Sequence, residues 1–140
     1  MEIYNLQDDI KVFCATAKSF PEGVQEAFIK LETMLSKEGR TFYGISYKNR
    51  LGEIVYKAAV SENYEGESEK YGFETFTIRK GEYLTEKIIN WMTNMHAFGE
   101  TFQKLLSDPR LDTTGYCLEW YKSDEEVDCM VKINTPLKAL

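Results

Sequence analysis

The stretch GYCLEWYKSDEEVDCMVKI, residues 115–133, predicts a β-hairpin closed by the polar turn Ser123-Asp124-Glu125. Its second arm alternates apolar residues with larger or charged ones, which is the period of a half-buried strand. The apolar positions of that arm are Val127, Cys129, Val131 and Ile133. The first arm alternates in the same way, so the hairpin predicts an antiparallel sheet with one buried face.

Glu119 is the residue of this hairpin that does not suit a strand built only for packing, because it is a carboxylate between Leu118 and Trp120. On a solvated face it would pair loosely with Lys132, for about 0–1 kcal/mol. In a pocket it would be the polar anchor. A two-residue turn directs Leu118 and Trp120 toward the helices, whereas a three-residue turn with a bulge would change this register. The side chains that the two-residue turn directs to the open face are Cys117, Glu119, Tyr121, Asp128, Met130 and Lys132.

Length, composition and charge limit the kinds of protein that this sequence can encode. The chain has 140 residues, 43% of them hydrophobic, and a net charge of −6, which predicts one folded domain over residues 1–140. No apolar run reaches the roughly 20 residues of a membrane helix, and the acidic N-terminus is not a signal peptide. We therefore expect a cytoplasmic protein with no membrane contact. Scattered Lys and Arg in an acidic chain argue against direct nucleic-acid binding.

The cysteines and the histidine do not suggest a metal or a catalytic triad. Cys14, Cys117 and Cys129 lack metal-type spacing, and the predicted register places the last two on opposite faces as free thiols. His96 has no Cys or His partner in the sequence, and no glycine-rich phosphate loop is present. We expect no cofactor and no metal.

The remaining elements follow from periodicity and from turn residues. Residues 1–9 are expected to be a lead-in to the first strand. A helix is predicted from a capping box, Ser19 to Glu22, to about Lys37, with Val24, Phe28, Leu31 and Leu35 buried. Ser61–Lys70 is predicted to be an exposed connector, and the tail from Pro136 to lie outside the core. The predicted strands are Ile10–Thr16, Phe42–Tyr47, Glu53–Val60, Phe73–Ile78 and Glu82–Ile88. A second helix is predicted to have begun by Met95. Its residues Phe98, Phe102, Leu105 and Leu106 are predicted to face the core.

The second half of the sequence repeats the first. EAFIKL at Glu26 corresponds to ETFQKL at Glu100, and EIVYKAAV at Glu53 corresponds to EVDCMVKI at Glu126. The order strand–helix–strand–strand occurs twice, in repeats of about 10–60 and 73–134. We therefore predict an α+β fold of duplicated β-α-β-β units, an antiparallel sheet with two helices on one face and a ligand groove at the pseudo-twofold axis.

Four motifs in order, SFPEGV, YGISY, KGEY and GYCLEWY, make the chain resemble the GyrI-like small-molecule-binding domain over about residues 8–134. This domain is the effector-binding half of multidrug-sensing bacterial transcription activators. The resemblance implies an aromatic-lined pocket and a glutamate on the penultimate strand that contacts cationic lipophilic ligands. Glu119 matches that glutamate. The sequence lacks the helix-turn-helix of the regulators, so a regulatory role is expected to need a separate protein partner.

The leading functional prediction is a stand-alone protein that binds lipophilic, cationic or aromatic small molecules. The predicted ligand-binding residues are Glu119, Tyr121, Trp91, Tyr43, Tyr83 and Met130. The alternative, also implied by the resemblance, is a hydrolase of cyclopropane-containing toxins, in which Glu119 would be catalytic as a general base. A third interpretation is a pure interaction domain that uses residues 61–70. The sequence leaves the oligomeric state open.

Overall fold

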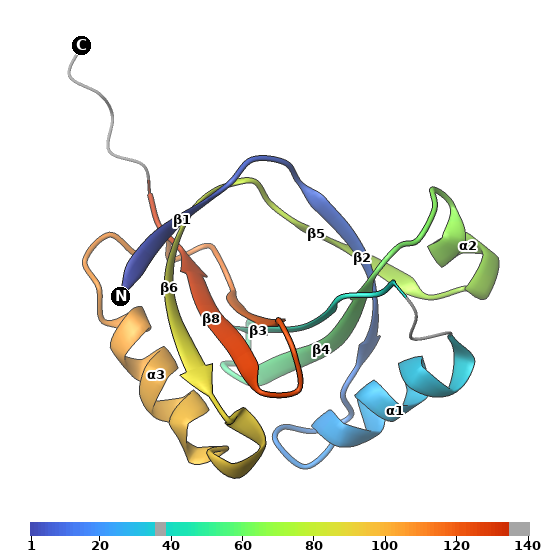
Figure 1. The fold of residues 1–140 in the computed structure, drawn as a ribbon, viewed down its shortest axis with the longest axis horizontal. Helices are drawn as coiled ribbons and strands as arrows, with labels where there is room; N and C mark the ends of the chain where they lie inside the picture. Colours follow the sequence, from blue (N-terminus) through green and yellow to red (C-terminus); the bar gives the residue numbers. More distant parts are fainter. Residues whose placement is uncertain (36–38, 135–140) are drawn as a thin grey trace. The chain divides into compact units, whose positions relative to one another are not determined.

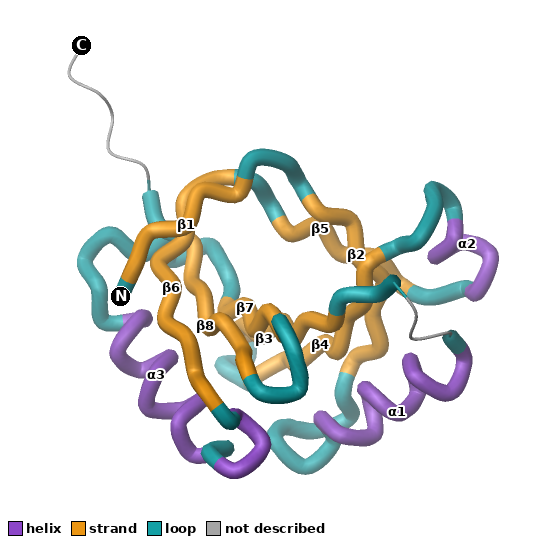
Figure 2. The backbone as a smooth tube through the Cα atoms, in the orientation of Figure 1, coloured by secondary structure: helices purple, strands orange, loops and turns teal. Residues whose placement is uncertain are grey.

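The computed structural model describes residues 1–35 and 39–134 and divides the chain into two compact units (Figure 1). Unit 2 comprises Asp9–Ile78, and unit 1 comprises Met1–Asp8 together with Arg79–Leu140. Every strand pairing within either unit is antiparallel, and helices pack on the strands, so the class is α+β (Figure 2). The predicted ends of two segments, the helix to about Lys37 and the tail from Pro136, lie outside the described residues.

Unit 2 is an antiparallel set of strands in the order β3-β4-β2-β5. Its elements are β2 (Ile10–Thr16), α1 (Val24–Met34), β3 (Phe42–Lys48), β4 (Ile54–Ser61), α2 (Glu67–Tyr71) and β5 (Glu74–Ile78). Ala27, Leu31 and Leu35 from the helical segment pack onto Phe13 and Val60 of the strands. Burying such side chains contributes about 1.5–3 kcal/mol for each large one, so this layer holds α1 on the strands.

The predicted capping box at Ser19 is wrong. Helix α1 begins at Val24, its N-cap is Gly23, and no side chain caps it. The Gly23 amide donates to the Ser19 carbonyl at 3.1 Å, so the chain turns between them before the helix starts. A Cβ on Gly23 would lie 2.9 Å from the backbone nitrogen and oxygen of Ser19, which explains why this position is occupied by glycine. Ser19 is therefore too far before the helix to reach its first amides.

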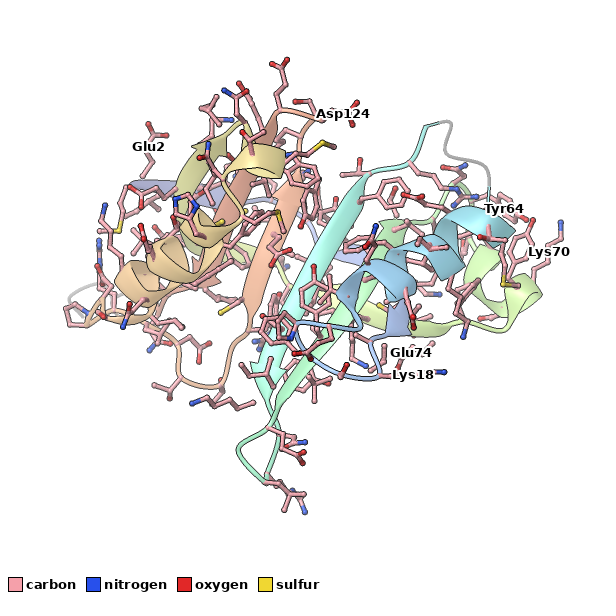
Figure 3. All side chains as sticks on the ribbon, turned by 90° about the horizontal axis from the view of Figure 1, so that it is seen from below. Glu2, Lys18, Tyr64, Lys70, Glu74 and Asp124 are labelled. Carbon is pink, nitrogen blue, oxygen red and sulfur yellow. The ribbon has the colours of Figure 1, made fainter. Side chains whose placement is uncertain are left out.

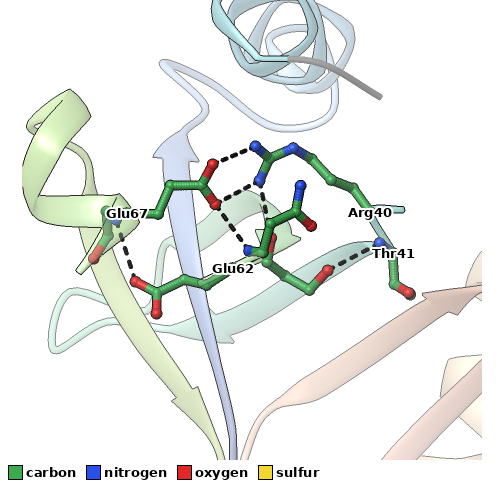
Figure 4. Close-up of polar contacts among 7 residues, drawn as sticks. Arg40, Thr41, Glu62 and Glu67 are labelled. Atoms are coloured by element: carbon green, nitrogen blue, oxygen red, sulfur yellow. Dashed lines mark hydrogen bonds and ion pairs between the residues drawn. The ribbon is translucent and has the colours of Figure 1, made fainter. Parts of the chain in front are cut away.

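The predicted exposed connector, Ser61–Lys70, is also wrong, because it contributes α2 and a buried ion pair to unit 2. The Arg40 guanidinium binds the Glu67 carboxylate with two nitrogens, and the two side chains are 4% and 3% exposed (Figure 4). Arg40 also donates to the Ser61 carbonyl at 3.2 Å, and Glu67 accepts from the Asn63 amide at 2.9 Å. Charge and polarity suggested a solvated loop, whereas the partner of Glu67 lies 27 residues away.

Unit 1 has the strand order β1-β6-β8-β7. Its elements are β1 (Glu2–Leu6), β6 (Gly81–Ile89), the 3₁₀ helix η1 (Trp91–Thr93), α3 (His96–Leu106), β7 (Cys117–Tyr121) and β8 (Glu126–Lys132). Strand β1 corrects the predicted lead-in, since a short polar edge strand carries no clear apolar alternation. Leu105 is buried, whereas Leu106, also predicted inward, is 46% exposed. Consecutive helical residues point about 100° apart, so only one of the two can face the strands.

Both units contain the order strand–helix–strand–strand, as β2-α1-β3-β4 and as β6-α3-β7-β8. In each unit an extra edge strand, β5 or β1, pairs with the first strand of that set. A duplicated origin and a ligand groove stay predictions. None of the described helices is long and apolar enough to cross a bilayer.

Candidate functional site

The β7–β8 hairpin of unit 1 closes through three residues rather than two. Tyr121 lies opposite Val127, and the Lys122 amide donates to the Glu126 carbonyl at 3.0 Å. The Ser123 hydroxyl accepts from the Glu125 and Glu126 amides at 3.1 Å each, which stabilises the tight loop. Figure 3 labels Asp124 in this loop. The extra residue shifts the register by one relative to the predicted two-residue turn.

A one-residue shift moves every side chain of an arm to the other face. Glu119 lies opposite Cys129, so Glu119 shares its face with the apolar side of β8, which α3 covers. The predicted open-face set is therefore split. Cys117, Glu119 and Tyr121 lie on the α3 face, while Asp128, Met130 and Lys132 lie on the opposite face. Trp120, predicted to pack toward the helices, is opposite Asp128 and also lies away from α3.

Glu119, Tyr121 and Trp91, which we call the Glu119 cluster, are in contact with one another through Tyr121. The Tyr121 hydroxyl donates to the Glu119 Oε1 atom at 2.6 Å. The rings of Tyr121 and Trp91 meet edge to face, with centroids 5.0 Å apart and planes at 68°. All three side chains are partly exposed. The sequence placed Glu119 and Tyr121 on one face, and the structure adds Trp91 to them.

Trp91 is held beside the hairpin by its backbone and by its indole. Asn90 has φ of 55°, a left-handed conformation that asparagine tolerates better than most residues. The Asn90 amide donates to the Glu125 carbonyl at 2.6 Å. The indole Nε1–H of Trp91 donates to the Ser123 carbonyl at 3.1 Å. Both bonds end in the hairpin loop, so that loop positions the tryptophan against Tyr121.

Two cysteines, Cys117 and Cys129, lie near the Glu119 cluster, and Cys129 is buried. Burial raises the pKa of the Cys129 thiol, and the negative charge of Glu119 raises it further. Cys129 therefore stays protonated at neutral pH. Cys117 and Cys129 are free thiols as predicted, but they share the α3 face rather than lying on opposite faces. Lys132, the predicted partner of Glu119, lies on the other face with its ammonium 6.0 Å from the Tyr83 ring centroid.

The other predicted ligand residues do not join the Glu119 cluster. Met130 is 2% exposed and lies on the face away from α3. Tyr83 is fully buried in unit 1, and its hydroxyl donates to the Arg79 carbonyl at 2.6 Å and lies 2.6 Å from the Tyr116 hydroxyl. Tyr43 belongs to unit 2, where it is 2% exposed on β3. Their ligand-binding roles stay predictions.

A cavity of about 370 Å³ opens on the face of unit 1 away from α3, the kind of open face on which the sequence predicted the ligand-binding residues. Its lining includes Met130 but not Glu119. The sequence feature that could have indicated this cavity is the presence of both aromatic and charged residues on the solvent-facing side of the strands. These residues are Tyr4, Lys87, Trp120 and Lys122. Among the described residues, no group of three or more His, Cys, Asp or Glu could hold a metal ion.

No family model and no curated protein sequence matches this chain. Several solved structures resemble it. An integron cassette protein from the mobile metagenome of Vibrio cholerae, VCH_CASS2, has a TM-score of 0.71 and 13% identity, with 95% of each chain covered. SAV2435, solved with tetraphenylphosphonium bound, has a TM-score of 0.58 and 11% identity, with 94% of this chain and 93% of that one covered.

A protein of Staphylococcus aureus MU50, described as a bacterial transcription regulation protein, has a TM-score of 0.55 and 11% identity, with 94% and 97% covered. The likeness shows a shared fold. At these identities it assigns no residue of this chain a role.

Proposed function

We propose that this protein binds a small lipophilic cation at the Glu119 cluster, as an effector-binding protein of the GyrI-like type. The observation that carries the proposal is the 2.6 Å hydrogen bond from the Tyr121 hydroxyl to a partly exposed Glu119 carboxylate, with Trp91 against the same tyrosine. A carboxylate attracts a cation, and the neighbouring rings supply apolar surface and cation–π attraction of about 0.5–2 kcal/mol each. The cluster thus offers both charge and lipophilic complementarity.

The cluster is ordered before a ligand arrives. Tyr121 holds one oxygen of the carboxylate, and two hydrogen bonds to the hairpin loop hold Trp91. A site whose rotamers are already fixed loses less conformational entropy on binding, so more of the contact energy contributes to affinity. The Glu119 carboxylate and the ring faces of the two aromatics are the groups proposed to contact the ligand.

The shared fold adds support for this class of ligand. SAV2435 was solved with tetraphenylphosphonium, a lipophilic cation, and the third similar structure is described as a transcription regulation protein. The hydrolase alternative has no observation of its own among the described residues and stays a prediction.

The experiment is calorimetric titration with tetraphenylphosphonium of wild type, Glu119→Gln and Tyr121→Phe. Glu119→Gln keeps the shape and removes the charge, so we expect affinity to fall roughly tenfold to a hundredfold. Tyr121→Phe keeps the ring and removes the hydroxyl that donates to the carboxylate, so a smaller loss is expected. Glu125→Gln is the matched control, because Glu125 is exposed in the loop of the same hairpin.

We expect Glu125→Gln to bind like wild type. The proposal is overturned if wild type does not bind tetraphenylphosphonium, or if Glu119→Gln and Glu125→Gln bind it equally well. Thermal melts of each variant separate loss of the site from loss of the fold.

A further inference from the structure

The cavity on the face of unit 1 away from α3 is lined by both apolar and charged side chains. Its lining includes Tyr4, Lys87, Trp120, Lys122, Asp128 and Met130. Thr85 and Met130 are cross-strand neighbours on β6 and β8, and both line it. The rings of Tyr4 and Trp120 meet edge to face at 5.8 Å, although they come from β1 and β7. The volume of about 370 Å³ is in the range of small-ligand sites.

Two lysines meet one carboxylate in this cavity. The Lys87 ammonium lies 3.2 Å from Asp128 and also 3.0 Å from Glu126. The Lys122 ammonium lies 3.9 Å from Asp128 and 3.4 Å from the centroid of the Trp120 ring. Lys122 therefore stacks on an aromatic face and has a distant, shared counter-ion. Burial lowers the pKa of Lys122, the charge of Asp128 opposes this shift, and the charge of Lys87 adds to it.

The acidic groups of the cavity are already paired or are exposed. Glu86 pairs with Lys104 of α3 at 2.8 Å, and Asp128 pairs most closely with Lys87. Glu2 lies on the edge strand β1 and is exposed (Figure 3). A cationic guest would meet Lys122 and Lys87, whereas an anionic guest would give Lys122 the close partner that it lacks. Lys122 is therefore the group of this cavity that favours a negative ligand.

We propose that this cavity binds a small aromatic carboxylate, with its carboxylate paired to Lys122 and its ring packed on Met130 beside Tyr4 and Trp120. The site lies on the opposite face of the strands from the Glu119 cluster and selects the opposite charge. A short N⁺–H···O⁻ contact in a partly desolvated site is among the stronger polar interactions. The surrounding aromatic and thioether groups supply the apolar contacts that the ring needs.

The test is calorimetry with three probes that share one ring system: 2-naphthoate, neutral 2-naphthamide and cationic 2-naphthylmethylammonium. We expect 2-naphthoate to bind and the other two to bind at least tenfold more weakly. Equal affinity for the three probes, or no binding of 2-naphthoate at millimolar concentration, overturns the proposal.

Variants then assign the charge selection to named residues. Lys122→Gln should weaken 2-naphthoate binding roughly tenfold to a hundredfold, the loss of one charge-assisted contact. Lys132→Gln is the matched control, because Lys132 lies on the same face of β8 but does not line the cavity. Glu2→Gln removes a repulsive charge at an exposed edge position and should tighten binding. A Lys122→Gln affinity equal to that of Lys132→Gln overturns the assignment.

The two tryptophans locate each ligand independently. The sequence has two, Trp91 in the Glu119 cluster and Trp120 in the cavity. In Trp91→Phe the remaining indole should respond to 2-naphthoate, and in Trp120→Phe it should not. Glu119→Gln should leave 2-naphthoate binding unchanged, and Lys122→Gln should leave tetraphenylphosphonium binding unchanged. A loss of 2-naphthoate binding in Glu119→Gln would place the anion in the wrong site and overturn the proposal.

Discussion

Substitution of Glu67 by Gln should destabilise the protein far more than the loss of an exposed carboxylate would. Arg40 and Glu67 are 4% and 3% exposed, and the carboxylate accepts from both guanidinium nitrogens and from the Asn63 amide. Gln keeps the shape but leaves the guanidinium charge buried without its counter-charge. Breaking one side of such a pair costs about 3–5 kcal/mol.

The change in melting temperature follows from the chain length. At about 2.1 cal/mol/K of unfolding entropy for each residue, the 140 residues give about 0.3 kcal/mol/K. The expected fall in Tm is therefore roughly 10–17 °C. The free energy of unfolding is measured by urea denaturation followed by far-ultraviolet circular dichroism. Glu69→Gln is the matched control, because Glu69 is an exposed residue of the same short helix.

The pH dependence gives a second check on the same pair. The hydrogen bond from Arg40 holds the pKa of Glu67 below its ordinary value of 4.5. A depressed folded pKa gives stability that is complete above the unfolded pKa and is lost as pH falls through the folded pKa. The gap between wild type and Glu67→Gln should therefore be full at pH 7 and narrow below about pH 4.5. A loss under about 1 kcal/mol at pH 7, or one equal to that of Glu69→Gln, would refute the reasoning.

Two further predictions rest on the buried thiols and on the tight turn before α1. Thiol titration of unfolded, unreduced protein should count three, whereas the folded protein near pH 8 should expose only Cys117, because burial raises the pKa of Cys14 to about 12 and raises that of Cys129 as well. Rapid labelling of all three in the folded protein would contradict the burial. Gly23→Ala should lower the free energy of unfolding by about 1–3 kcal/mol, because its Cβ would lie 2.9 Å from the Ser19 backbone. Urea denaturation measures this, and an unchanged midpoint would show that the turn can relax.

The periodicity of apolar residues along the sequence was enough to predict most of the helices and strands. Strand Ile10–Thr16 has the predicted bounds, and the other predicted strands agree with β3 to β6 within a residue or two. These elements are encoded by alternation and helical period over a few consecutive residues. The same local rule put Glu119 and Tyr121 on one face, because side chains two residues apart on a strand always share a face.

Which face they share was decided by the tertiary structure. The face depends on the register of both arms, and one additional residue in the Ser123–Glu125 loop reverses it. That single residue turned Trp120 toward the cavity and turned Glu119 and Tyr121 toward α3, where Trp91 contacts Tyr121 from the turn after β6, whereas Met130 keeps its predicted face. Likewise, Glu67 looked like part of a solvated acidic loop until the fold brought Arg40 to it from 27 residues away. Sequence period reports which side chains alternate, whereas the partner of a polar group is set by contacts between segments that are distant along the chain.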